Sequence, residues 1–173
     1  MTPPELPEEF EVVDSPQLDP EALLLCGLMW AGRTHPASDA VCRLLQPGDF
    51  HDPHYSLLFG FIASRRSADR PVDPASLGSA LQEMGEEAPL PRHTARRLLL
   101  ELTTLSVLPE LVTDYADQVL GLSYRRQYLA MAAALLHAGE TRPEGELFAL
   151  LLEHGRAQRA AWERRQALRP REG

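Results

Sequence analysis

Residues 46–81 read QPGDFHDPHYSLLFGFIASRRSADRPVDPASLGSAL, and this stretch decides the fold class. It contains an Asp-Pro pair at residues 52–53 and another at residues 73–74, each followed by an apolar run. An aspartate before a helix accepts hydrogen bonds from the first free N–H groups, and a proline in the first turn removes no bond that the helix needs. A third pair, at residues 19–20, precedes the run ALLLCGLMW. The sequence therefore predicts three helices whose structural caps are Asp19, Asp52 and Asp73.

Apolar residues keep a helical spacing on both sides of this stretch. A short helix is predicted near residues 38–45 and a longer one over residues 92–105. Two long runs follow, about residues 109–137 and about residues 146–168, with a turn at residues 139–145 between them. Long helices joined by a short turn form an antiparallel hairpin. Because no segment alternates as a strand does, the sequence predicts an all-α fold.

The chain divides into three predicted regions. Residues 1–18 are rich in proline and acidic residues and are expected to form a disordered tail. Residues 19–108 are expected to form a compact multi-helix head, and residues 109–173 a long antiparallel helical hairpin with a short tail. A chain of 173 residues suits such a domain with an appendage.

All 17 basic residues are arginine, and the sequence contains no lysine. A phosphate-binding loop ends in Lys-Ser or Lys-Thr because this lysine pairs with the β- and γ-phosphates of a nucleotide. We therefore expect no nucleotide hydrolysis and no cofactor. The net charge of −8 also opposes whole-surface binding of nucleic acid, which depends on neutralising phosphates.

The cysteines and the hydropathy of the sequence indicate the cellular compartment of the protein. Cys26 and Cys42 lie in apolar helical runs, which is typical of buried core residues in a reducing cytoplasm. The start MTPPELPEEF lacks the basic and apolar regions of a signal peptide. No apolar run approaches the roughly 18 residues of a membrane span, so the sequence predicts a soluble cytoplasmic protein without membrane contact.

Two groups of polar residues could carry chemistry, and each has a structural alternative. Asp49, His51, Asp52 and His54 have the side chains of a metal-dependent hydrolase, but capping and packing explain them better, so we predict no catalytic or metal-binding residue. Arginine doublets at residues 65–66, 96–97 and 125–126 could bind phosphates only if they converge. Near the C-terminus, Trp162 lies among Arg156, Arg159, Arg164 and Arg165. These arginines could cover an acidic surface of a partner with Trp162 as the anchor, or Trp162 could close the apolar contact between the two helices of the hairpin itself.

The hairpin has more apolar surface than two helices and a head can enclose. Pairing with a second hairpin would bury the surplus, at roughly 25 cal/mol per Å² before the costs of association. We therefore predict self-association, or binding of a partner, through this part of the chain. The candidate interface comprises Arg125, Arg126, Leu129, Ala133, Leu136, Phe148, Leu151, Leu152 and Trp162.

Four blocks of residues follow one another along most of the chain. The first block is Pro20-Glu21-Ala22 with Leu25, Gly27 and Met29, and the second is Leu44-Leu45, Pro47, Asp49-Phe50, His54, Leu58-Phe59 and Ile62. The third is Pro71-Val72-Asp73 with Leu77, and the last is Tyr115-Ala116, Val119, Arg126 and Leu129. The order of these blocks resembles the N-terminal domain of DnaB-type replicative helicases. The family's Gly-Gly-x-x-Tyr-Leu segment and Pro-Ser/Thr-Ala-Ala-Asn turn are replaced by APLPRHTARRLLLEL and TLSVLPELVTDYA, which indicates a diverged stand-alone relative or a fragment without the ATPase domain.

This resemblance implies a function. In the family the domain forms a helical head and hairpin, assembles as dimers within a ring, and docks the C-terminal domain of primase. The expected role is a non-catalytic interaction and oligomerisation module of the DNA replication machinery. Its expected partners are a second copy, primase or a replicative helicase, with only indirect or weak contact with DNA. The alternative is a helical nucleic-acid-binding domain that uses the arginine patches.

Overall fold

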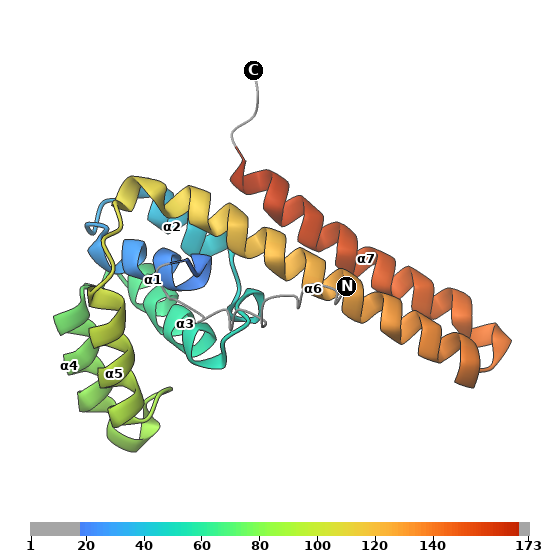
Figure 1. Ribbon diagram of the computed structural model, residues 1–173, viewed down its shortest axis with the longest axis horizontal. Coiled ribbons are helices and arrows are strands. Elements are labelled where there is room, and N and C mark those ends of the chain that lie inside the picture. The colour runs from blue at the N-terminus through green and yellow to red at the C-terminus, as the bar shows by residue number, and fades with distance from the viewer. Residues whose placement is uncertain (1–17, 170–173) are drawn as a thin grey trace, which may run out of the picture.

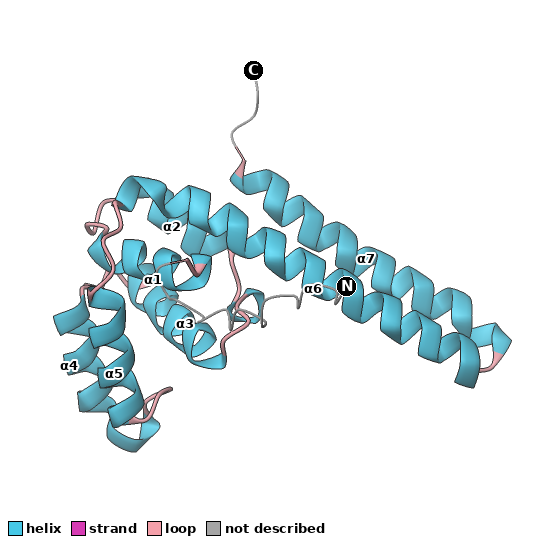
Figure 2. Cartoon of the chain, viewed as in Figure 1, coloured by secondary structure: helices cyan, strands magenta, loops and turns pink. Residues whose placement is uncertain are grey.

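The computed structural model describes residues 18–169, and this range is helical with no strand (Figures 1 and 2). The predicted tail lies outside the described residues except for Leu18, as do residues 170–173. The α-helices are α1 (Pro20–Trp30), α2 (Pro36–Leu44), α3 (Pro53–Ser67), α4 (Pro74–Met84), α5 (Arg92–Thr103), α6 (Val112–Thr141) and α7 (Glu144–Leu168). Three short 3-10 helices are η1 (Pro47–Asp49), η2 (Gly85–Glu87) and η3 (Pro109–Leu111). The predicted all-α class, a head followed by a long hairpin, is confirmed.

The head is built around α1, which is enclosed as its continuous apolar run predicts. Leu24, Leu25 and Leu28 are fully buried, and α3 adds Phe59 to the same core. The first half of α6 packs on α1, and Gly27 permits the close approach. A Cβ at that position would lie only 2.9 Å from Cγ2 of Val112.

Three helices begin with an aspartate whose carboxylate accepts backbone N–H bonds. Asp19 accepts from the N–H of Glu21 at 2.9 Å. Asp52 accepts from the N–H groups of residues 54 and 55 at 2.7 and 3.1 Å. Asp73 accepts from the N–H of Ser76 at 2.9 Å. These contacts satisfy donors that the first helical turn leaves without partners.

The short helix predicted near residues 38–45 begins two residues earlier than expected. It is α2, which starts at Pro36 after an N-cap at His35. The ring nitrogen Nδ1 of His35 accepts from the N–H of Ser38 at 3.3 Å, so histidine supplies in α2 the cap that aspartate supplies in α1, α3 and α4.

The hairpin turn is tighter than the sequence suggested. A turn was expected over residues 139–145, but α6 continues through Gly139 to Thr141 and α7 begins at Glu144. Only Arg142 and Pro143 connect the two helices. A residue before proline is driven out of the helical region, and Arg142 has an extended ψ of 150°. The proline therefore ends α6, whereas a helical glycine costs only about 1 kcal/mol.

Candidate interaction surface and the arginine contacts beneath it

Asp49, at the end of η1, joins the head to the last helix. It is only 1% exposed. Its carboxylate accepts bonds from the N–H of Gln46 at 2.8 Å and from Oγ of Ser123 at 2.9 Å. The guanidinium of Arg164 donates to both carboxylate oxygens, at 2.6 and 3.0 Å, and also to the carbonyl of Leu44 at 3.3 Å. This bidentate pair connects residues 115 positions apart, and such charge-assisted bonds are among the strongest in proteins.

A second carboxylate, Asp117 on α6, holds the end of α7. It accepts two bonds from Arg165, at 3.0 and 3.3 Å, and two from Arg169, at 3.0 and 3.2 Å. These bonds, the one from Arg165 foremost, lower the pKa of Asp117 below its ordinary value of 3.8. Gly121 leaves room for the contact, since a Cβ there would lie 3.0 Å from Nη2 of Arg165. We refer to Asp49, Asp117, Arg164, Arg165 and Arg169 as the arginine clamp.

Glu21 on α1 is another buried carboxylate, and it binds the backbone that follows Asp49. It is 4% exposed, and it accepts bonds from the N–H groups of His51 at 2.6 Å and Asp52 at 3.2 Å. Arg126 lies 3.8 Å from its carboxylate and donates to the carbonyl of Asp49. Burial is the main cause that raises the pKa of Glu21, and the two N–H groups and Arg126 oppose it. Arg126, a residue of the predicted interface, thus also makes contacts within the chain.

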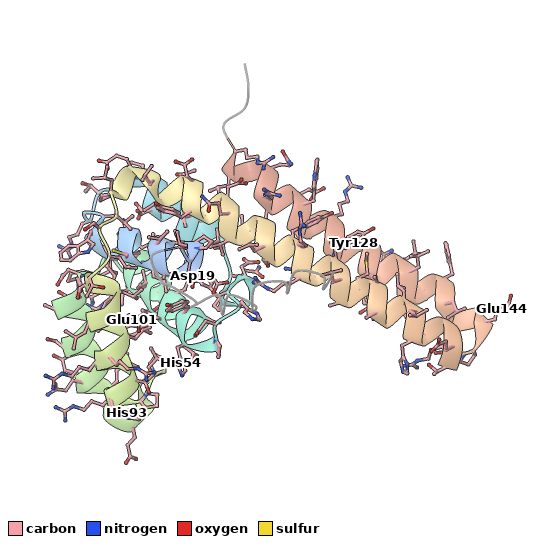
Figure 3. All side chains as sticks on the ribbon, in the orientation of Figure 1. Asp19, His54, His93, Glu101, Tyr128 and Glu144 are labelled. Carbon is pink, nitrogen blue, oxygen red and sulfur yellow. The ribbon has the colours of Figure 1, made fainter. Side chains whose placement is uncertain are left out.

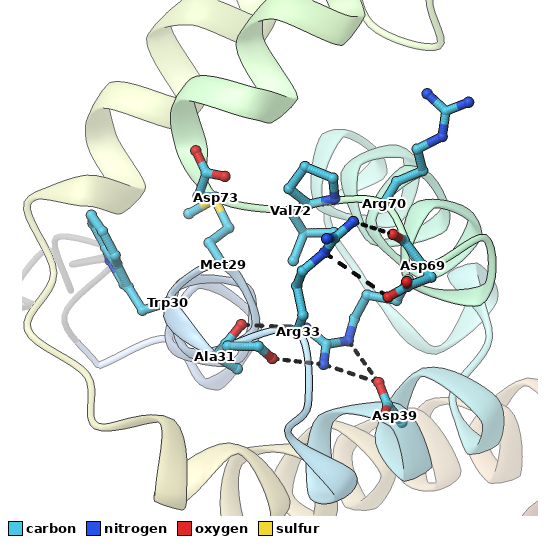
Figure 4. Close-up of a pocket in the computed structure, with 12 residues that line it drawn as sticks. Met29, Trp30, Ala31, Arg33, Asp39, Asp69, Arg70, Val72 and Asp73 are labelled. Atoms are coloured by element: carbon cyan, nitrogen blue, oxygen red, sulfur yellow. Dashed lines mark hydrogen bonds and ion pairs between the residues drawn. The ribbon is translucent and has the colours of Figure 1, made fainter.

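The arginine doublets do not form one basic patch. Arg66 is 4% exposed in its side chain and pairs with Asp39 at 2.9 Å (Figure 4). It also donates to the carbonyls of Ala31 and Gly32, at 3.4 and 3.2 Å. Its neighbour Arg65 donates to a loop carbonyl at 2.9 Å. Arg66 and Arg126 each make contacts within the chain. The doublets at residues 65–66 and 125–126 can therefore each offer at most one guanidinium to a ligand.

The residues of the metal-site alternative have separate structural tasks. The carboxylate of Asp49 is engaged by Arg164, and that of Asp52 caps α3. His54 lies exposed beside Asp52, with Nδ1 3.5 Å from the carboxylate. No group of three or more His, Cys, Asp or Glu side chains within residues 18–169 has the arrangement of a metal site. Over the same range, no helix is both long and apolar enough to span a bilayer.

The predicted interface residues lie largely on the exposed faces of the hairpin. On α6, Leu129 and Leu136 are 65% and 68% exposed, and Arg125 and Ala133 are exposed with them. Tyr128, which the sequence analysis did not select, is also exposed on the same helix (Figure 3). A spacing of three or four residues places Arg125, Leu129, Ala133 and Leu136 on one face.

The last helix presents a second exposed row. Phe148 is 69% exposed, and Leu151 and Leu152 are exposed beside it. Trp162 is 52% exposed, so it does not close the seam of the hairpin, where Ala161 is buried instead. The two positions 148 and 162 are about four turns apart and share a face. We define the hairpin surface as Leu129, Ala133, Leu136, Phe148, Leu151, Leu152 and Trp162.

A cleft connects the hairpin to the head. Its volume is about 760 Å³. Leu122, Arg125 and Leu129 line it from α6, and Pro53 and Tyr55 line it from α3. Charged residues, among them Glu21, Asp52 and Glu101, also line the cleft. Three predicted interface residues, Arg125, Arg126 and Leu129, therefore lie where the hairpin meets the head.

Sequence reasoning missed the acidic half of the clamp. The cluster of Arg164 and Arg165 suggested an acidic surface on a partner, but the acids that they bind are Asp49 and Asp117 of the same chain. No local pattern reports a contact between residues this far apart. The only signal was that Asp49 belongs to the Asp-Phe motif of the resemblance.

Comparison with known proteins extends these observations. The family model described as DnaB-like helicase N terminal domain matches residues 14–120. The crystal structure of the N-terminal domain of DnaB helicase from Mycobacterium tuberculosis has the same fold, with a TM-score of 0.62 and 21% sequence identity. The match covers 84% of this chain and 96% of that chain. No curated protein matches. Because the family model covers more than half of the chain, the protein belongs to the family of DnaB-like helicase N-terminal domains.

Proposed function

We propose that the chain is a non-catalytic protein-interaction and oligomerisation module of the DNA replication machinery. The observation that carries this proposal is the hairpin surface, which leaves Phe148, Trp162 and several leucines exposed in the single chain. Apolar patches of this kind on soluble proteins mark sites of interaction. Membership in a helicase domain family supplies the replication setting.

A second copy is the proposed occupant of the hairpin surface. The surface combines aromatic and aliphatic side chains with exposed Arg125 and Arg159 nearby, which is the composition of energetically important interface residues. A two-fold dimer would use the same patch on both copies, and dimers can then assemble into a ring. Primase, through its C-terminal domain, or a replicative helicase is the proposed partner of the assembly, and DNA contact is indirect or weak.

The non-catalytic part of the proposal is supported by how the polar side chains are used. The buried carboxylates of Glu21 and Asp49 bind N–H groups and guanidinium groups of the chain itself. The printed sequence also offers no lysine for a phosphate-binding loop.

Sedimentation velocity tests the role of the hairpin surface. We expect the unmodified chain to dimerise at tens of micromolar (about −6 kcal/mol). The double substitution Phe148→Asp with Leu152→Asp places two charges on one face of α7 and should give a folded monomer. The matched control is Ala149→Asp with Ala160→Asp, which adds the same charges to exposed positions on another face of α7 and should leave the dimer intact.

Circular dichroism of each variant establishes that it is folded. A monomeric unmodified chain over the whole concentration range would contradict the proposal. So would equal dissociation by the control pair, because the effect would then come from added charge and not from the hairpin surface.

A further inference from the structure

A groove runs between α4 and α5. These two helices lie at the end of the head opposite the hairpin (Figure 1). Its volume is about 450 Å³. The pair packs against the rest of the molecule through α5 and α1, and His93 marks its free end in Figure 3. One face of each helix lines the groove. These faces comprise Pro74, Ala75, Gly78, Ser79, Leu81 and Gln82 on α4, and Arg92, Ala95, Arg96, Leu99, Leu100 and Thr103 on α5.

The groove has a small-residue floor and an apolar edge. Ala75, Gly78 and Ala95 carry little or no side chain, so the backbone of a third helix could approach closely. Leu99 is buried beneath the floor, whereas Leu100 stands 60% exposed at the edge. The row on α5 extends over twelve residues, which corresponds to about 18 Å or roughly three helical turns.

The charge at one end of the groove is positive. Arg92 and Arg96 line it and are exposed, and neither forms an ion pair with another residue in the range 18–169. Arg92 also stands in the first turn of α5, where no acidic residue occurs and where Pro91 provides no side-chain cap. A cation at this end opposes the helix dipole, so an acidic group brought from outside would stabilise both the arginines and the helix start.

We propose that this groove binds an amphipathic helix of another protein that has leucine-type side chains on one face and acidic residues beside them. The apolar floor takes the leucines, and Arg92 and Arg96 pair with the acidic residues. Laying an apolar helix face into a groove is a common mode of peptide recognition, with contacts at positions i, i+3 or i+4, and i+7. The site lies on the head and is independent of the hairpin surface, so it does not depend on self-association.

A synthetic peptide tests the proposal with the full chain. The probe is a fluorescein-labelled helix of about four turns (roughly 14 residues) with leucines along one face and glutamates along one flank. Fluorescence anisotropy should show saturable binding that weakens as salt is added. Arg92→Glu with Arg96→Glu should weaken binding at least about ten-fold. A peptide with lysine in place of glutamate should bind this double variant better than it binds the unmodified chain.

Two matched controls keep the result specific to the groove. Arg97→Glu reverses a charge on the same exposed stretch of α5 outside the groove lining, and it should change binding less than about two-fold. Leu100→Ser should weaken binding, whereas Leu108→Ser, at an equally exposed leucine outside the groove, should not. The double arginine variant should remain folded because it places an acid in the first turn of α5.

Three results would overturn the proposal. One is the absence of saturable binding up to about 1 mM peptide. Another is an equal loss of binding in Arg97→Glu, which would mean that net charge alone attracts the peptide. The third is tighter binding of a peptide with the sequence of residues 1–17, MTPPELPEEFEVVDSPQ, abolished by the same double variant, because the chain's own acidic segment would then be the occupant.

Discussion

Asp49 combines nearly complete burial with a negative charge. A carboxylate removed from water is costly unless its oxygens are fully bonded, and here a backbone N–H, a serine hydroxyl and a guanidinium supply the bonds. Removing one member of such a set leaves the others without partners. The consequence of a substitution therefore exceeds the value of the contact itself.

Replacing this carboxylate should be strongly destabilising. We expect Asp49→Ala to lower the free energy of unfolding by about 3–5 kcal/mol, since Arg164 would lose its buried counter-charge. Asp69→Asn is the surface control, because asparagine also tolerates the left-handed backbone of that residue (φ 51°). Its carboxylate is 87% exposed beside Arg33, and its loss should cost less than about 1 kcal/mol. Urea denaturation measures both, and similar small losses for the two variants would show that the buried pair does not hold α7 to the head.

Glu21 should give the protein a measurable dependence on pH. Its pKa is raised above 4.5 chiefly by burial, so its contribution to stability is complete below pH 4.5 and is lost as the pH rises through the folded pKa. Glu21→Gln cannot ionise. We expect this variant to lose less stability than the unmodified chain as the pH is raised above 4.5, as followed by urea unfolding in pH steps.

Asp117 provides the internal comparison for that experiment, because its shift has the opposite sign. Bonds from Arg165 and Arg169 lower its pKa below 3.8, so its contribution is present above pH 3.8 and is lost as the pH falls through the folded value. Asp117→Asn should therefore flatten only the acid side of the profile of stability against pH.

If Glu21→Gln left the profile of stability above pH 4.5 unchanged, Glu21 would have no raised pKa in the folded chain.

At the scale of the elements, the capping aspartates fix where helices begin. The carboxylates of Asp52 and Asp73 each accept bonds in the first turn. Hydrogen bonds from Ser76, first from its side chain and then from its backbone N–H, lower the pKa of Asp73. Both helices follow with a proline that is already set for the helical φ.

Loss of either cap should destabilise the fold moderately. We expect Asp52→Ala and Asp73→Ala each to cost about 0.5–2 kcal/mol, because helix donors return to water or stay unbonded. Thermal melting followed by circular dichroism measures the change, with Asp→Asn at the same positions as the conservative control. Unchanged melting midpoints in both alanine variants would show that the helices do not depend on these residues for their starts.

The elements that short-range chemistry encodes are the ones that the sequence predicted well. Asp-Pro starts and leucine periodicity locate α1, α3, α4 and α5, and their helical class is confirmed. The predicted hairpin turn is too broad because a glycine at position 139 favours a helix end, whereas the steric effect of Pro143 on Arg142 decides the boundary.

The candidate site was predictable only in part. The exposed apolar residues of the hairpin surface follow from helical spacing, since positions that face away from the partner helix can be counted along the chain. The arginine clamp could not be found in this way. Its contacts join α6 and α7 to the head through the fold as a whole, and a sequence of charges does not report which of them meet.

At the scale of the whole molecule, the positive charges are divided among separate tasks. Arg164, Arg165 and Arg169 belong to the clamp, Arg66 and Arg126 to contacts of the head, and Arg92 and Arg96 to the groove. The chain as a whole carries a net charge of −8. Such a distribution does not present a continuous track for a phosphate backbone.

We therefore expect weak binding of DNA by the isolated chain. Titration with labelled single-stranded and forked DNA should give no saturable binding at tens of micromolar protein and about 0.15 M salt. Tight binding that falls steeply with added salt, and that Arg96→Ala with Arg97→Ala removes, would establish the nucleic-acid-binding alternative. The self-association variant Phe148→Asp with Leu152→Asp serves as a control for avidity in this titration.

The clamp lies on the last five residues of α7 and its cap, and this position also determines how the molecule would respond to force. Tension applied beyond Leu168 reaches Arg169 first, then Arg165 and Arg164, before it reaches the tip of the hairpin. Because two of these side chains are bound to α6 and the third to η1, the load divides between the first half of the long helix and the head. The tip of the hairpin therefore carries no load while these bonds are intact. A pulling experiment would have to break short charge-assisted bonds before α7 separates from α6.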